Sequence, residues 1–141
     1  MKNSVVLAFD FGLKNIGVAC GNVMLGSATP LAALKARDGQ PRWEEIGNLI
    51  REWQPLEMIV GLPLNMDGSE SEMSARAQKF ARRLHGRFGV QVHLFDERLS
   101  SAEAKSLARD RGHSGDYGEE PIDSLAASLI LQSWWNANPN A

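Results

Sequence analysis

The feature that most constrains the fold is the segment Leu7–Ala19, LAFDFGLKNIGVA. The apolar run Val5–Phe9 at its start predicts a strand buried on both faces, as in the middle of a sheet that is at least partly parallel. Asp10 follows this strand, and an ionised carboxylate there is costly unless backbone amides or a cation satisfy it. Asp-x-Gly is also ordinary turn chemistry, so the local pattern is consistent with a turn residue as well as with a cation ligand. We expect the cation.

The apolar pattern resumes at Ile16, so the segment consists of a strand, a tight corner and a second strand. This layout predicts a hairpin with Asp10 at its base. It resembles the start of two known groups, the RNase H-like nucleases and the two-domain sugar-kinase, actin and chaperone ATPases. The chain has 141 residues, which is enough for one domain with a sizeable core but not for two. Its length therefore disfavours the ATPases, which close two such domains over a nucleotide.

Composition and charge set further limits on compartment and partners. The formal net charge is −2, so a nucleic-acid partner would have to be met by a local basic surface. The single cysteine, Cys20, lies in an apolar segment and is expected to be a small buried core residue in a reducing compartment. Met1–Asp10 lacks the basic head and cleavage site of a signal peptide, and no apolar run approaches the ~20 residues of a membrane span. We therefore expect a cytoplasmic protein without a membrane partner.

The apolar periodicities predict one domain over residues 1–135, followed by a disordered tail over 136–141. Three strands linked by short turns come first, and Pro30 indicates that the third lies at a sheet edge. Ser-x-x-Glu capping boxes predict helix starts at Ser69 and Ser100, and Pro121 suits the first turn of a last helix. The expected strands are Val5–Asp10, Asn15–Asn22, Met24–Leu34, Met58–Val60 and Val90–Phe95; the expected helices are Trp43–Trp53, Ser69–Phe88, Ser100–Ala108 and Pro121–Trp135, with a loop at Arg37–Pro41 and another at Arg109–Glu120.

This order predicts an α/β fold with a mixed five-stranded sheet, in which three antiparallel strands are followed by β-α units and helices cover both faces. The crossovers would put the fourth strand beside the first, and the fifth beside the fourth. The carboxyl ends of these three strands then share one rim, and ligands of open α/β sheets bind at such ends.

Three carboxylates from distant segments can meet at that rim. Asp10 ends the first strand, Asp96 or Glu97 ends the fifth, and Asp123 begins the last helix. Acids that converge repel one another when the site is empty, and an all-oxygen site suits Mg²⁺ or Mn²⁺. Two such ions ~3.5–4 Å apart activate a water and stabilise the leaving oxygen of a phosphodiester.

Each of these acids also has an ordinary structural interpretation. Asp123 alone is well explained as a helix cap or as a favourable charge at a helix N-terminus. The acid after the fifth strand is explained as a surface group paired with Arg98. Adjacent strand residues point to opposite faces, so Asp96 competes directly with Glu97 and spacing does not choose between them.

The segments LAFDFGLKNIGVA, IVGLPLNMDGS, DERLSS and DSLAASLIL together resemble the YqgF/RuvX family of RNase H-like proteins, in family order and over about residues 4–135. Its members are described as Holliday-junction resolvases or as pre-16S ribosomal RNA nucleases. The resemblance implies an RNase H-like fold and a hydrolase of the two-metal-ion type. It also implies that Asp10, Glu97 and Asp123 are the catalytic and metal-binding residues, which favours Glu97 over Asp96 by analogy.

Three further residues are candidates for substrate binding. Lys14 in the first hairpin and Arg98 beside the strand-end acid could hold phosphates; an exposed lysine and a surface ion pair are the alternatives. Asn65 lies in a loop whose amides could accept an anionic backbone, unless the loop merely needs its glycines to turn. Basic residues at helical spacing could follow a duplex backbone, although such a face is usually only solvated; they are Arg76, Lys79, Arg83 and Arg87.

The leading hypothesis is a metal-dependent nuclease that processes the 5′ end of precursor 16S ribosomal RNA in ribosome biogenesis, with structured RNA and pre-ribosomal particles as partners. The second is resolution of branched, four-way DNA junctions, which normally requires a two-fold dimer. No strong dimer surface is visible in the sequence, and we expect a monomer or a weak homodimer. The third is a transcription-associated nucleic-acid-binding factor without catalysis. One departure from the family pattern is Gly118-Glu119-Glu120, where members often carry lysines.

Overall fold

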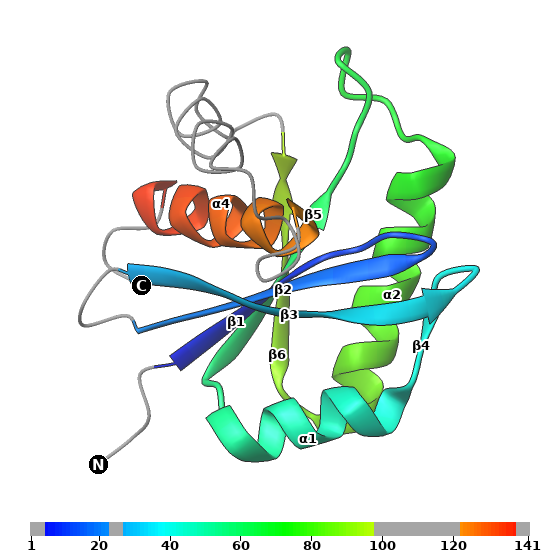
Figure 1. Ribbon diagram of the computed structural model, residues 1–141. Helices are drawn as coiled ribbons and strands as arrows, with labels where there is room; N and C mark the ends of the chain where they lie inside the picture. Colours follow the sequence, from blue (N-terminus) through cyan, green and yellow to red (C-terminus); the bar gives the residue numbers. More distant parts are fainter. Residues whose placement is uncertain (1–4, 23–26, 98–121, 138–141) are drawn as a thin grey trace.

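The computed structural model describes residues 5–22, 27–97 and 122–137 (Figure 1). Its sheet is mixed, with strand order β4-β3-β2-β1-β5-β6. The first three strands form an antiparallel meander, and β5 and β6 continue the sheet parallel to β1, so the expected neighbours of the first strand are confirmed. The strands are β1 (Val5–Asp10), β2 (Asn15–Asn22), β3 (Ser27–Arg37), β4 (Gln40–Pro41), β5 (Glu57–Leu62) and β6 (Gln91–Asp96).

Helices cover both faces of the sheet, as predicted. On one face lie α1 (Trp43–Trp53) and α2 (Glu72–Phe88), and α4 (Ile122–Ala137) crosses the other face, against β1, β2, β3 and β5 (Figure 1). Residues of β1 alternate between the two sides: Leu7 and Phe9 join the core beneath α1 and α2, whereas Val6 and Ala8 join the core beneath α4.

Each side of the sheet has its own aromatic centre. Phe80 of α2 lies edge-on to Phe9, with ring centroids 5.8 Å apart, and stacks on Trp43 of α1 at 5.7 Å. On the other side Trp134 and Trp135 are buried in the core beneath α4. Both tryptophans therefore pack inside the protein and offer no platform for bases.

The sheet has six strands rather than the five predicted, because the segment assigned to a loop contains β4. Asp38 and Gly39 both have positive φ, 50° and 79°, and join Arg37 to its partner Gln40 in a two-residue hairpin. Asp-Gly is the usual sequence signal for such a turn. Within the described residues β4 pairs only with the end of β3, so Pro30 keeps the edge position predicted for it.

The N-cap of α2 lies two residues later than predicted. Ser71, not Ser69, is the N-cap: its Oγ accepts from the Ser74 amide at 3.0 Å, and Ser74 Oγ accepts from the Ser71 amide at 2.7 Å. The Ser69 hydroxyl donates instead to Asp67 Oδ1 at 2.6 Å. Because that hydroxyl is engaged in the preceding turn, the second serine caps the helix.

Other boundaries differ by a few residues. The third strand ends at Arg37 rather than Leu34, and the last helix continues through Ala137, two residues into the predicted tail. The predicted helix Ser100–Ala108 and the segment Gly118–Glu120 lie outside the described residues. None of the described helices is long and apolar enough to cross a bilayer, and Cys20 is buried, as expected.

Candidate active site

The carboxyl ends of β1, β5 and β6 meet at one rim of the sheet, and Asp10 is the last residue of β1. The parallel register pairs Phe9 with Val60, so its continuation places Asp10 level with Gly61 on the next strand, about 4.8 Å away. Alternate residues of β1 before it, Val6 and Ala8, face α4. The half-buried Asp10 side chain therefore faces α4 as well.

Glu97 follows β6 directly and lies on the same face. A Cβ built on Gly61 would lie 3.1 Å from Glu97 Oε2 and 2.6 Å from Ile130 Cδ1 of α4, so the carboxylate and α4 share one side of the sheet. Phe95 also packs beneath α4, and strand alternation then directs Asp96 to the opposite face. Asp10 and Glu97 thus flank Gly61 on the α4 side.

The absence of a side chain at Gly61 has a specific reason. Gly61 is not among the residues with positive φ, so its backbone conformation does not require glycine for a turn. What requires glycine is the close approach of Glu97 and Ile130. This contact joins residues far apart in the chain and has no local sequence signal.

A buried hydrogen bond fixes where α4 begins. The pairing of β2 with β3 is irregular between Ile16 and Val18, and the Val18 amide donates to Ser124 Oγ at 3.3 Å. Gly17 pairs with Asp10 across β1 and β2, so the first turn of α4 starts beside the end of β1. Asp123 belongs to that turn; its side chain is outside the described residues.

Within the described residues, no three His, Cys, Asp or Glu side chains gather closely enough to hold one ion. Of the three expected ligands, only Asp10 and Glu97 have side chains among those that the structure describes. Their donor atoms are carboxylate oxygens on one side of the rim, which is the donor type that Mg²⁺ and Mn²⁺ prefer. Asp10 and Glu97 therefore fit a hard divalent cation. The backbone of Asp123 lies nearby, in the first turn of α4 beside the end of β1.

The predicted substrate-binding residues are placed as follows. Lys14 is exposed in the β1–β2 turn, and its carbonyl accepts from the Ala36 amide at 2.8 Å, which ties this turn to β3. The Asn65 side-chain amide donates to Ser69 Oγ at 3.0 Å and to the Glu70 carbonyl at 3.4 Å, so it shapes its own loop. Arg98 is outside the described residues.

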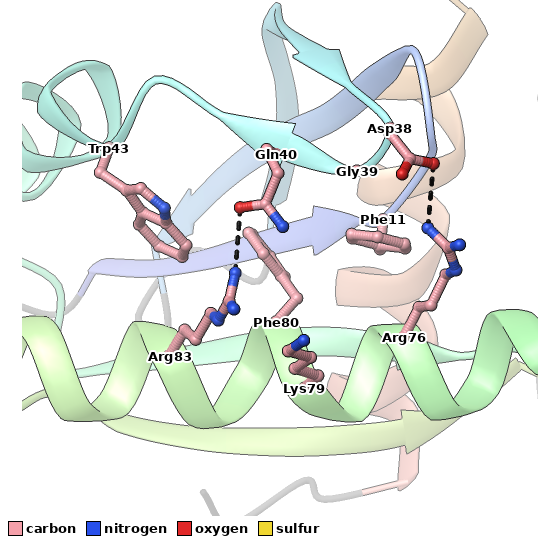
Figure 2. A pocket seen from close by; sticks show the side chains of 9 residues that line it. All are labelled: Phe11, Asp38, Gly39, Gln40, Trp43, Arg76, Lys79, Phe80 and Arg83. Carbon is pink, nitrogen blue, oxygen red and sulfur yellow. Dashed lines mark hydrogen bonds and ion pairs between the residues drawn. The ribbon is translucent and has the colours of Figure 1, made fainter.

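The sequence did not reveal a pocket of about 310 Å³ between α2 and the β3–β4 hairpin (Figure 2). Arg76 of α2 reaches Asp38 at 3.2 Å, and Arg83 donates to Gln40 Oε1 at 2.9 Å. The basic spacing on α2 was visible in the sequence, and recognition of the Asp-Gly hairpin would have supplied the opposite wall. The lining residues are Phe11, Asp38, Gly39, Gln40, Trp43, Arg76, Lys79, Phe80 and Arg83.

Solved structures with a similar fold are resolvases. The chain matches T. thermophilus RuvC in complex with Holliday junction substrate with a TM-score of 0.58 at 15% identity, covering 96% of each chain. It matches the yeast mitochondrial Holliday junction resolvase Ydc2 with a TM-score of 0.57 at 11% identity, covering 94% of this chain and 78% of that one. At these identities the likeness shows the fold alone, and it confirms the RNase H-like architecture.

Sequence relatives are much closer. A Chromohalobacter salexigens protein named "Putative pre-16S rRNA nuclease" is 61% identical over 131 residues, 93% of this chain and 88% of that protein. A Saccharophagus degradans protein of the same name is 52% identical over 139 residues, covering 99% and 98%. The family model described as RuvX, Holliday junction resolvase, matches residues 4–137. The chain therefore belongs to the RuvX family.

Proposed function

We propose that this chain is a divalent-metal-dependent nuclease that hydrolyses phosphodiester bonds at the 5′ end of precursor 16S ribosomal RNA in the cytoplasm. The observation that most supports this is the shared position of Asp10 and Glu97 on either side of Gly61 at the rim of the sheet. The hydrogen bond from the Val18 amide to Ser124 Oγ supports the inclusion of Asp123 as the third ligand, because it anchors the turn that contains Asp123. The names of the close relatives support the choice of substrate.

Each residue has a defined task in this proposal. Asp10, Glu97 and Asp123 would hold Mg²⁺ or Mn²⁺, and a pair of such ions supplies an activated water and stabilises the leaving oxygen. Gly61 keeps the space that the Glu97 carboxylate needs. Lys14, exposed in the turn that follows Asp10, would neutralise a phosphate next to the scissile one. Arg98, which follows Glu97 in the sequence, would have the same task.

The test compares three variants on a precursor rRNA fragment with Mg²⁺ and with Mn²⁺. Asp10→Asn and Glu97→Gln keep side-chain volume but remove a ligand charge, and we expect each to slow cleavage at least about 100-fold. Asp96→Asn is the matched control, since this neighbouring acid points to the opposite face and should retain cleavage. Mn²⁺ should raise the melting temperature of wild type and of the control, but not of Asp10→Asn.

The proposed site fails if Asp10→Asn cleaves at the wild-type rate, or if Asp96→Asn loses activity while Glu97→Gln keeps it. Circular dichroism of each variant separates a lost ligand from a lost fold.

The family description favours a second candidate, resolution of four-way DNA junctions. The same substrate panel therefore includes such a junction. Cleavage confined to the junction would replace the RNA assignment, and it would call for a two-fold dimer that cuts symmetrically, which sedimentation would detect. Tight binding without cleavage by wild type on either substrate would instead indicate a non-catalytic nucleic-acid-binding factor.

A further inference from the structure

Basic side chains gather around the β3–β4 hairpin, on the side of the sheet that α1 and α2 cover. In the first pocket Arg76 and Arg83 reach from α2 to the β3–β4 hairpin, and Lys79 lies on α2 between the two arginines (Figure 2). Asp38 and Gln40 form the opposite wall. Three cations and one carboxylate leave this pocket with two positive charges in excess.

A second pocket, of about 380 Å³, adjoins the first at the edge strand. Its lining contains Lys35, Arg37 and Arg42, and it shares Gln40 with the first pocket. The two pockets together are lined by six of the 15 lysines and arginines of the chain, and Asp38 is the single acid among their lining residues. A chain with a net charge of −2 therefore has a strongly basic local surface here.

Most of these cations are not neutralised by the protein. Arg76 pairs with Asp38 at 3.2 Å and with Glu72 at 3.5 Å, but the two acids are 77% and 83% exposed, and such surface pairs are weak. Within the described part of the chain, Lys79 and the three cations of the second pocket make no ion pair. Their mutual repulsion would be relieved by a bound polyanion.

The basic pockets are held rigidly with respect to Asp10. Phe11, the next residue, is buried and lines the first pocket, and a Cβ on Gly39 would lie 2.7 Å from its ring. The Gly39 amide donates to the Leu13 carbonyl at 2.9 Å, and the Lys14 carbonyl accepts from Ala36. The β1–β2 turn, which carries the exposed Lys14, and the β3–β4 hairpin thus form one unit.

We propose that these two pockets, called here the hairpin track, bind the sugar-phosphate backbone of the nucleic-acid substrate beyond the catalytic rim. An elongated polyanion with regularly spaced charges fits two adjoining basic pockets, whereas a single small anion would occupy only one. Contacts of this kind fix the position of a substrate without reading its sequence. That the bound polymer is a nucleic acid rests on the proposed function. The observation that the two pockets are basic does not depend on that function.

The test measures binding separately from cleavage. A fluorescently labelled RNA hairpin with a single-stranded 5′ leader is titrated with protein in the presence of a chelator, and anisotropy gives the affinity between about 50 and 200 mM salt. The test pair Lys79→Gln/Arg42→Gln removes one exposed cation from each pocket. The control pair Arg51→Gln/Arg82→Gln removes two exposed cations from α1 and α2 that line neither pocket.

We expect the test pair to lower the slope of log affinity against log salt by about 2, one unit for each cation that no longer meets a phosphate, and to weaken binding for every RNA sequence. The control pair should keep the wild-type slope. Asp38→Asn should tighten binding, because it removes the one acid of the track, and asparagine tolerates the positive φ of 50° at this position.

Equal slopes for the test and control pairs would overturn the inference, as would a wild-type protein that binds neither RNA nor a four-way DNA junction at low salt. The outcome is independent of the nuclease assignment. If the test pair weakens binding but wild type never cleaves, the hairpin track stands and the proposed function fails. If wild type cleaves RNA and the test pair behaves like the control pair, the proposed function stands and the hairpin track fails.

Discussion

Adding one methyl group at Gly61 is the most direct structural test of the active site. In Gly61→Ala the new Cβ would lie 2.6 Å from Ile130 Cδ1 and 3.1 Å from Glu97 Oε2. Contacts below 3.0 Å essentially never occur for real Cβ atoms, so something must shift. Because φ at this residue is not positive, the substitution does not strain the backbone. Its cost comes from the two side chains that must move.

The two clashes have separable consequences. Ile130 is 2% exposed and has little room to move, so we expect overpacking to cost about 1–3 kcal/mol. For a chain of this length that lowers the melting temperature by roughly 4 °C per kcal/mol. The Glu97 carboxylate must shift by only a few tenths of an ångström, and this shift affects catalysis instead. Because a misplacement of about 1 Å slows an enzyme about 100-fold, we expect a smaller loss here, of roughly 10-fold or less.

A second substitution tells the two effects apart. Ile130→Val removes Cδ1 at a cost of about 0.5–1.5 kcal/mol on its own. In the Gly61→Ala background it should recover much of the lost melting temperature, since it removes the nearer clash. The overlap with Glu97 remains, so RNA cleavage and stabilisation by Mn²⁺ should both stay low. Full recovery of cleavage in the double variant, or wild-type cleavage by Gly61→Ala, would refute the assigned role of Glu97.

Two further predictions concern buried groups. Ser124→Ala leaves the Val18 amide without its acceptor, so urea denaturation should show a loss of about 1–3 kcal/mol in the free energy of unfolding. Cleavage should also fall, because the start of α4 is no longer anchored. Unchanged stability and activity would contradict the role of this hydrogen bond. Burial raises the pKa of the Cys20 thiol above its ordinary 9.0, which keeps it protonated and unreactive at neutral pH. Native protein should therefore resist alkylation until it unfolds, and rapid labelling of the folded protein would show the burial to be wrong. The contribution of this thiol to stability should be complete below its ordinary pKa of 9.0 and should be lost as the pH rises above that value.

The elements predicted correctly are those with a strong local pattern. The apolar run Val5–Phe9 and the helical spacing of Trp43, Ile46, Ile50 and Trp53 give β1 and α1 with their observed bounds. Prediction fails where competing local interactions are nearly equivalent. Ser69 and Ser71 are both able to cap α2, and the contact of Ser69 with Asp67 decides between them. β4 was missed because two residues are too short for any alternation to be visible.

The choice between Asp96 and Glu97 shows the same limit at the candidate site. It depends on which face of β6 lies beneath α4, and the two apolar residues that precede these acids do not reveal it. In the structure Leu94 is 43% exposed while Phe95 is 5% exposed and packs beneath α4. This difference arises from packing between distant segments. The resemblance to a family selected Glu97 by analogy, and the position of its carboxylate beside Gly61 now gives that selection a geometric argument.

The small net charge of the chain conceals a separation of opposite charges across the sheet. Asp10 and Glu97 lie at the rim on the α4 side, whereas six cations line the hairpin track on the α2 side and at the edge strand. Four of these cations are exposed, namely Lys35, Arg37, Arg42 and Lys79. Salt therefore screens their attraction for a phosphate backbone beyond a Debye length of about 8 Å at physiological ionic strength. In the proposed mechanism, ion coordination at the rim acts over much shorter distances than this attraction does. Salt should therefore weaken substrate binding at the hairpin track far more than it weakens metal binding by the carboxylates.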